Sequence, residues 1–196
     1  TYTLRKTTFN ECINPKPDIC YMVLEYFGTA TLPVTAAGYT AAFQRCCRIN
    51  GINNVIPPTN NLGNTYSIQL PGNIFGNQNL ENNSPIFVEK DTAVVCFNST
   101  FSLDYSANDP DQDSLVYEFA PAFAGGSPNS PSPVTSSPPP FQSLPYAGVF
   151  PPDRPLGLDI QINRFTGEIT GQTPATTGEY VIAVAVKEYR NGRLIA

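Results

Sequence analysis

Hydrophobic and β-branched residues are grouped along this chain in short runs that turn-forming residues separate. Val, Ile, Thr, Tyr and Phe fit a pleated, half-buried strand, and short runs bounded by Gly, Pro, Asn and Asp are typical of strands. The last run is almost entirely apolar, which predicts a strand in the middle of a sheet. The runs are residues 21–27, 28–32, 66–70, 86–88, 93–97, 101–105, 115–119, 167–171 and 180–186.

Only residues 36–48 offer a helical alternative, and Gly38 and Thr40 make a strand equally compatible with them. We therefore predict an all-β fold built from tandem β-sandwich domains. A stretch rich in Asn, Gly and Pro precedes Ser84-Pro85. We place the boundary there, with an N-terminal sandwich over 1–85 and a second sandwich over 86–196 that we expect to be truncated at its C-terminal end.

The composition favours an extracellular protein. Only 14% of the 196 residues are charged, against about 25% in average globular domains, so Asn, Ser, Thr and Gln must supply the polar surface. The net charge is -5, and Lys and Arg form no cluster that would bind a phosphate backbone, which excludes nucleic acid as a partner. No apolar run is long enough to span a bilayer.

The five cysteines form no CxxC pair, and the chain has no His. Disulfides are therefore favoured over a zinc site. Cys12 and Cys20 would close a short loop, and either Cys46 or Cys47 could pair with Cys96. Because adjacent cysteines seldom bond each other, we expect Cys46 and Cys47 to have different partners.

Three carboxylates alternate along one predicted turn, at Asp109, Asp111 and Asp113. Ca²⁺ takes six to eight oxygen ligands, so carboxylates that converge in this way favour a calcium site. The positions of the EF-hand glycine and bidentate glutamate hold other residues, which excludes that motif. Asp104 and Glu188 are candidates to complete the site from neighbouring strands. The alternative is a solvated acidic turn, since Asp and Pro are common in turns.

No catalytic constellation is present in the sequence. Without His, Ser-His-Asp and Cys-His arrangements cannot form within the chain, and the glutamates show no pairing that would indicate an acid-pair glycoside hydrolase. We therefore expect no enzyme. Phe141, Tyr146 and Phe150 lie in a Pro-rich loop, where they could form a sugar-binding platform or pack back onto the sandwich.

The order of motifs in the second half resembles a known plan. Asp-Pro-Asp-Gln-Asp-Ser-Leu-Val-Tyr at 109–117 precedes Thr-Gly-Glu-Ile-Thr-Gly at 166–171, Gly-Glu-Tyr at 178–180 and a valine-rich strand. This half is similar to the immunoglobulin-like and cadherin-like modules of bacterial surface proteins. Nearly the whole chain resembles large Bacteroidota surface proteins. Its segments 44–54, 83–87 and 186–192 carry this likeness.

That resemblance implies a repetitive adhesin, exported by the type IX secretion system and associated with gliding motility. Its implied partners are a host or substratum surface, glycans, other surface proteins and, during export, the secretion machinery. The resemblance also adds support for calcium and implies O-glycosylation at Thr92 and Ser114. Relatives often have Cys at positions that are Ala120 and Ala185 here.

From these patterns we expect a non-catalytic, extracellular cell-surface module of a large adhesin, acting as a stalk or repeat or presenting a ligand. The alternative is a carbohydrate-binding module that uses the Pro-rich, aromatic loop 138–152. An acid-pair glycoside hydrolase is a third, less favoured interpretation.

Overall fold

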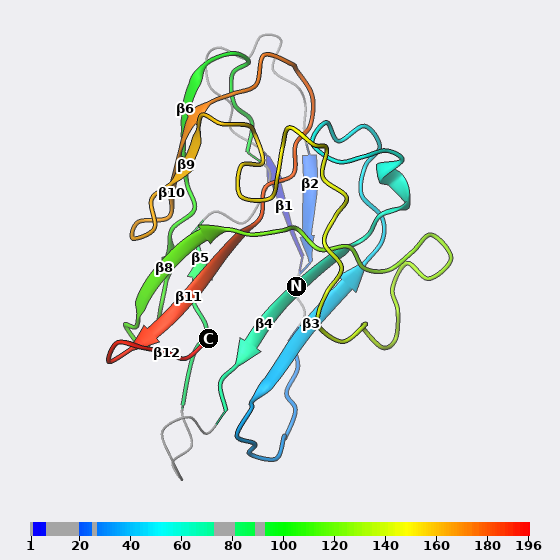
Figure 1. Ribbon diagram of the computed structural model, residues 1–196. Coiled ribbons are helices and arrows are strands. Elements are labelled where there is room, and N and C mark those ends of the chain that lie inside the picture. The colour runs from blue at the N-terminus through cyan, green and yellow to red at the C-terminus, as the bar shows by residue number, and fades with distance from the viewer. Residues whose placement is uncertain (1, 7–19, 25–26, 73–80, 89–92) are drawn as a thin grey trace.

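The structure is a computed structural model that describes residues 2–6, 20–24, 27–72, 81–88 and 93–196 (Figure 1). Its regular elements are almost all strands, which confirms the all-β prediction. Within the described residues the helical part is one short 3₁₀ turn, η1 (Thr59–Asn61). The strands are β1 (Tyr2–Lys6), β2 (Cys20–Leu24), β3 (Tyr39–Arg45), β4 (Asn64–Leu70), β5 (Ile86–Phe87), β6 (Thr100–Asp104), β7 (Ala107–Asn108), β8 (Ser114–Phe119), β9 (Ile160–Ile162), β10 (Glu168–Gln172), β11 (Val184–Arg190) and β12 (Arg193–Leu194).

These strands form small antiparallel sheets. The three-stranded sheets have the orders β6-β10-β9 and β12-β11-β8, and the two-stranded ones are β1-β2, β3-β4 and β5-β7. The valine-rich strand β11 therefore lies in the middle of its sheet, as its apolar pattern predicts. The segment with a helical alternative forms β3, paired with β4 along its whole length.

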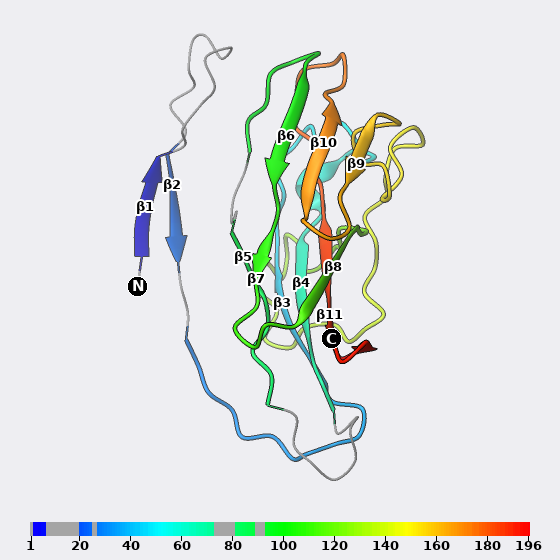
Figure 2. The same ribbon diagram turned by 90° about the vertical axis from the view of Figure 1, so that its left-hand side faces the viewer.

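The larger core lies between the two three-stranded sheets. Ile160 and Ile169 are buried on β9 and β10, and Phe119 and Val184 pack against them from β8 and β11. Figure 2 shows β6, β10 and β9 as one layer beside these strands. Alternation along each strand sends one set of side chains into this space, which is why short strands suffice to build it.

The turn that leads into β10 depends on a glycine. Gly167 has a φ of 74°, a conformation that L side chains seldom adopt. A Cβ at this position would also lie 2.7 Å from the carbonyl oxygen of Tyr105. The Thr-Gly-Glu motif therefore places the backbone of the turn directly against the end of β6.

A second cluster joins segments that are far apart in the sequence. Ile52 and Val55 pack with Ala122 and Leu144, across the boundary predicted near Ser84. The buried side chain of Asn54 reinforces this contact. Its Nδ2 donates to the carbonyl oxygens of Pro155 and Val181, both at 2.8 Å, and its Oδ1 accepts the Val181 N–H at 2.9 Å. The division of the chain at residue 85 stays a prediction.

Three predicted strands differ from the observed elements. Residues 28–32 and 93–97 form no strand, and those at 28–32 are exposed and pair with none of the described strands. The last strand begins at Val184 rather than at Tyr180. In the preceding residues the Val181 N–H donates to the Asn54 side chain instead of to a ladder. The carbonyl oxygens of Glu179 and Ala183 still accept the N–H groups of Asn53 and Ala120, so this segment is hydrogen-bonded without forming a continuous ladder.

Candidate cation site

The acidic turn before β8 is held by its own first carboxylate. Asp109 Oδ1 accepts the backbone N–H groups of Asp111 at 2.9 Å and Asp113 at 3.0 Å. Gln112 takes a positive φ of 63° between them. Such a local side-chain bond is characteristic of Asp in turns. The other oxygen, Asp109 Oδ2, is buried and finds no hydrogen-bond donor among the described residues.

Strand β11 brings a fourth carboxylate to this turn. Glu188 pairs in register with Leu115 of β8, so the antiparallel ladder places it beside the residues that enter that strand. One oxygen each of Asp109, Asp113 and Glu188 lies within 4.8 Å of the others. The Glu188 side chain is only 3% exposed, which is rare for a glutamate unless it is paired or coordinated.

Arg190 holds the same turn from two positions further along β11. Its Nε and Nη2 donate to the two oxygens of Asp113 at 2.8 and 2.7 Å, and Nη2 also reaches Asp111 at 3.2 Å. The Asp113 side chain is 4% exposed, so this is a largely buried, bidentate ion pair. Because residues two apart on a strand share a face, Glu188 and Arg190 both point at the turn.

A third segment closes the cluster. Asn83 donates through its backbone N and its Nδ2 to Asp111, at 2.6 and 2.9 Å. Asn82 Nδ2 donates to Glu188 Oε2 at 2.7 Å, and its Oδ1 accepts from Arg190 at 2.9 Å. The cluster therefore joins residues 81–83, the turn 109–113 and the end of β11. We call it the acidic junction.

The electrostatics of the acidic junction leave negative charge in excess. Burial raises the pKa of Glu188, the hydrogen bond from Asn82 opposes that rise, and the charges of Asp109 and Asp113 add to it. The pKa of Asp111 is lowered, chiefly by the two hydrogen bonds from Asn83. Among the described residues, four carboxylates here face the single guanidinium of Arg190, so an added cation would be stabilised.

The structure brings together three of the five predicted ligands. Asp109, Asp113 and Glu188 form the close group, whereas the oxygens of Asp111 are engaged by Asn83 and Arg190. Asp104 lies elsewhere because it ends β6, which belongs to the other three-stranded sheet. Its Oδ1 accepts the N–H of Ser106 at 2.9 Å, and it lines a shallow pocket with Ser102, Ser106, Thr166 and Glu168.

The sequence analysis missed Asn82, Asn83 and Arg190. The Glu-x-Arg spacing on one strand was a usable signal, since it puts both residues on the face that carries the predicted ligand Glu188. Asn82 and Asn83 gave none, because Asn is common in any loop. Their role depends on where the chain passes after β4.

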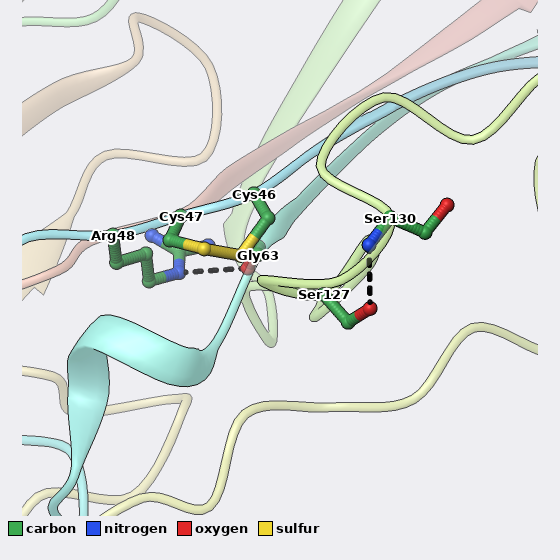
Figure 3. Close-up of a disulfide and its surroundings, with 6 residues drawn as sticks. All are labelled: Cys46, Cys47, Arg48, Gly63, Ser127 and Ser130. Atoms are coloured by element: carbon green, nitrogen blue, oxygen red, sulfur yellow. Dashed lines mark hydrogen bonds between the residues drawn. A yellow bond between two sulfur atoms is a disulfide. The ribbon is translucent and has the colours of Figure 1, made fainter.

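The cysteine prediction is wrong at one pair. Cys46 and Cys47 form a disulfide with each other (Figure 3). They follow the last residue of β3, so strand alternation does not separate their side chains. The backbone N–H of Cys46 donates to Pro131 at 2.9 Å, which holds this end of β3 against the loop 126–131. Cys96 is also disulfide-bonded. Cys12 and the side chain of Cys20 lie outside the described residues.

The three aromatic residues of the Pro-rich loop pack inward. The ring of Phe141 packs at a tilt against Phe123, with centroids 5.6 Å apart, and Phe150 meets Tyr180 edge-on at 5.8 Å. The hydroxyl of Tyr146 accepts the N–H of Ala122 at 2.9 Å, and burial raises its pKa. These contacts match the packing alternative and not an exposed sugar platform.

Of the two predicted glycosylation sites, Ser114 is exposed at the start of β8, and Thr92 lies outside the described residues. Scans against protein-family models, curated proteins and solved structures return no match. No helix in the described part of the chain has the length and apolarity to cross a membrane.

Proposed function

We propose that this chain is a non-catalytic, extracellular module of a cell-surface adhesin, and that a calcium ion bound at the acidic junction stiffens it. The observation that carries the proposal is the group formed by Asp109, Asp113 and Glu188. It contains a buried oxygen for which the described residues supply no donor and a glutamate almost fully removed from water. Such groups are costly unless a cation or a proton compensates them.

Calcium fits this donor set better than magnesium. Ca²⁺ accepts six to eight oxygens in irregular geometry, so three carboxylates can be supplemented by backbone carbonyls and water. Mg²⁺ requires near-octahedral geometry and gives up its water reluctantly. Because the junction joins residues 81–83, 109–113 and 188–190, a bound ion would cross-link three segments of the chain. Such a cross-link would resist the stretching that a surface stalk experiences.

A non-catalytic role is supported by how the other acidic residues are used. Glu118 pairs with Lys187 at 2.7 Å on the surface, and Glu168 accepts from Ser102 at 2.7 Å. Asp104 lines the same shallow pocket as Glu168, but its Oδ1 already accepts the Ser106 N–H, so neither carboxylate of this pair is free for glycoside hydrolysis. Sugar binding by loop 138–152 has no comparable support, since Phe141, Tyr146 and Phe150 are packed inward.

Thermal unfolding of the oxidised protein tests the cation site. We expect calcium to raise the Tm, excess EDTA to reverse the rise, and magnesium to have a smaller effect, because a ligand that binds only the folded state stabilises it. Glu188→Gln should abolish the calcium response. Glu118→Gln is the matched control, since it removes a surface carboxylate of the same sheet. An unchanged Tm in calcium for the wild-type protein would refute the site.

Single-molecule stretching tests the mechanical part of the proposal. Calcium should raise the force at which the wild-type module unfolds, and it should leave Glu188→Gln unchanged. A calcium-dependent Tm with no change in unfolding force would support calcium binding but contradict a mechanical role for the ion in a stalk.

A further inference from the structure

The β3-β4 ribbon buries one end of its polar face, while Thr40, Ser67 and Gln69 on the same face are exposed. Gln44 and Thr65 lie opposite each other in the register, both are buried, and Gln44 Nε2 donates to Thr65 Oγ1 at 3.0 Å. The loop after residue 125 covers this face, with the Ser137 N–H donating to Gln44 Oε1 at 2.9 Å. These polar groups are therefore satisfied within the fold.

The opposite face of the ribbon is apolar and exposed. Phe43 and Tyr66 are paired across the strands, and they are 56% and 65% exposed. Ala41 and Ile68 form the next pair on the same face, and Ile68 is also exposed. A contiguous apolar patch of this kind is uncommon on a protein surface that contacts only water and usually marks a contact site.

A second ribbon in the same chain is isolated from the other described strands. β1 and β2 form their own two-stranded sheet, and neither packs extensively against another described strand. Figure 2 shows this ribbon standing apart from the rest of the molecule, with the segment that begins at residue 27 leading away from it to β3. A two-stranded ribbon by itself is marginally stable in water.

The sequence of this second ribbon suits an apolar face. Its register pairs Tyr2 with Leu24 and Leu4 with Met22. Because these pairs are two residues apart along each strand, strand alternation assigns them to one face of the ribbon. The five-residue strands β1 and β2 are long enough to cover the patch, which spans residues 41–43 of β3 and 66–68 of β4.

We propose that the apolar face of β3-β4 is the docking surface for the β1-β2 ribbon of the same molecule. Closure would put the apolar face of each ribbon against the other and build a two-layered N-terminal core. Residues 25–38 join the ribbons, and 14 residues reach up to about 45 Å when extended, so they do not prevent this contact. A tether of this length gives an effective concentration of order millimolar, which favours the ribbon's own chain over a second copy.

Photo-crosslinking from the exposed patch tests the proposal. Phe43→p-benzoylphenylalanine places the probe on the β3-β4 face, and Phe165→p-benzoylphenylalanine is the matched control, because Phe165 is 72% exposed in the turn before β10. After irradiation, we expect the probe at 43 to link to residues 2–6 or 20–24 within a monomer, at a yield independent of protein concentration. The probe at 165 should give no link to these strands.

Two crosslinking results would overturn the proposal. Dimers whose yield rises with concentration would assign the face to a second copy. Monomers in which the probe at 43 never reaches β1 or β2 would show that the ribbon does not cover the face.

A polar substitution gives a second readout that does not depend on the probe. Phe43→Ser should lower the Tm and accelerate proteolysis between residues 27 and 38, because it weakens the docking of the ribbon. Phe165→Ser should change neither. Equal behaviour of the two variants would contradict closure. Both variants should keep the calcium response, so failure here is distinct from failure of the cation site.

Discussion

The two halves of this chain use the same strand pattern with opposite results. In the second half, the apolar faces of β6, β10 and β9 meet those of β8 and β11, and Ile169 is fully buried between them. In the first half, the β3-β4 ribbon turns Phe43 and Tyr66 outward and buries Gln44 and Thr65. Alternation along a strand thus separates two faces, but it does not say which of them another element covers.

The difference lies in what reaches each face. The loop 125–137 hydrogen-bonds to the polar face of β3-β4, whereas the described strands leave the apolar face without a sheet opposite it. In the second half, the sheet β6-β10-β9 and the sheet β12-β11-β8 each cover the apolar face of the other. An exposed apolar face of this kind is therefore a sign of a contact that the described strands do not supply.

The largest contrast is between two isoleucines. Ile169→Ala in the second core should cost about 2–5 kcal/mol, the range for deletion of a buried aliphatic side chain. Ile68→Ala, on the β3-β4 face, should cost about 1 kcal/mol if the β1-β2 ribbon covers it in part, against roughly 0.5 kcal/mol or less for a bare surface site. Urea unfolding of both variants measures the difference. Equal costs would erase the distinction between the two halves.

The next effect concerns the side chain that joins the halves. Asn54→Ala removes one acceptor and two donated bonds, so the Val181 N–H and the carbonyls of Pro155 and Val181 lose their partner. An unsatisfied buried group costs about 1–3 kcal/mol, and we expect a loss of about 3 kcal/mol in urea unfolding. Asn53→Ala, which removes one exposed bond to Thr177, is the control. A small effect at both positions would mean that the halves are held by apolar packing alone.

The kinds of residue in the acidic junction could be predicted from the sequence better than their positions in space. Asp109, Asp113 and Glu188 were predictable because alternate carboxylates on a turn and a glutamate on a late strand fit one ion. Asp104 does not lie with them, and the sequence does not reveal that β6 belongs to the other sheet. The burial of Gln44 was not predictable either, because it depends on a loop some ninety residues away in the chain.

The pH dependence of stability separates the acidic junction from ordinary surface acids. Without divalent cations the folded state holds the Glu188 proton more tightly than the unfolded chain, because its pKa is raised from the ordinary 4.5. The stability that this proton contributes is complete below pH 4.5 and is lost as the pH rises through the folded pKa, by about 1.4 kcal/mol for each unit of difference. Asp111, whose pKa is lowered from 3.8, acts in the opposite sense and loses its contribution as the pH falls.

Glu188→Gln should therefore be more stable than the wild-type protein at neutral pH in EDTA, and equally stable in acid. Calcium should reverse the order at neutral pH, because only the wild-type protein gains an ion. Denaturant midpoints across the pH range, with and without calcium, provide the measurement. A glutamine variant that is less stable in EDTA at every pH would show that the carboxylate is needed for packing and not for a cation.

The smallest effect is expected at the adjacent cysteines. Their disulfide encloses no intervening residues, so it constrains the unfolded chain far less than the bridges of longer loops, which contribute about 2–4 kcal/mol. Cys46→Ser together with Cys47→Ser should lower stability by about 1 kcal/mol or less.

Trypsin offers a direct check of the pairing, because Arg45 and Arg48 flank the two cysteines. Digestion without reduction should release the tripeptide 46–48 at a mass two hydrogens below its dithiol form. Its recovery in a crosslinked peptide with Cys96 would restore the pairing expected from the sequence.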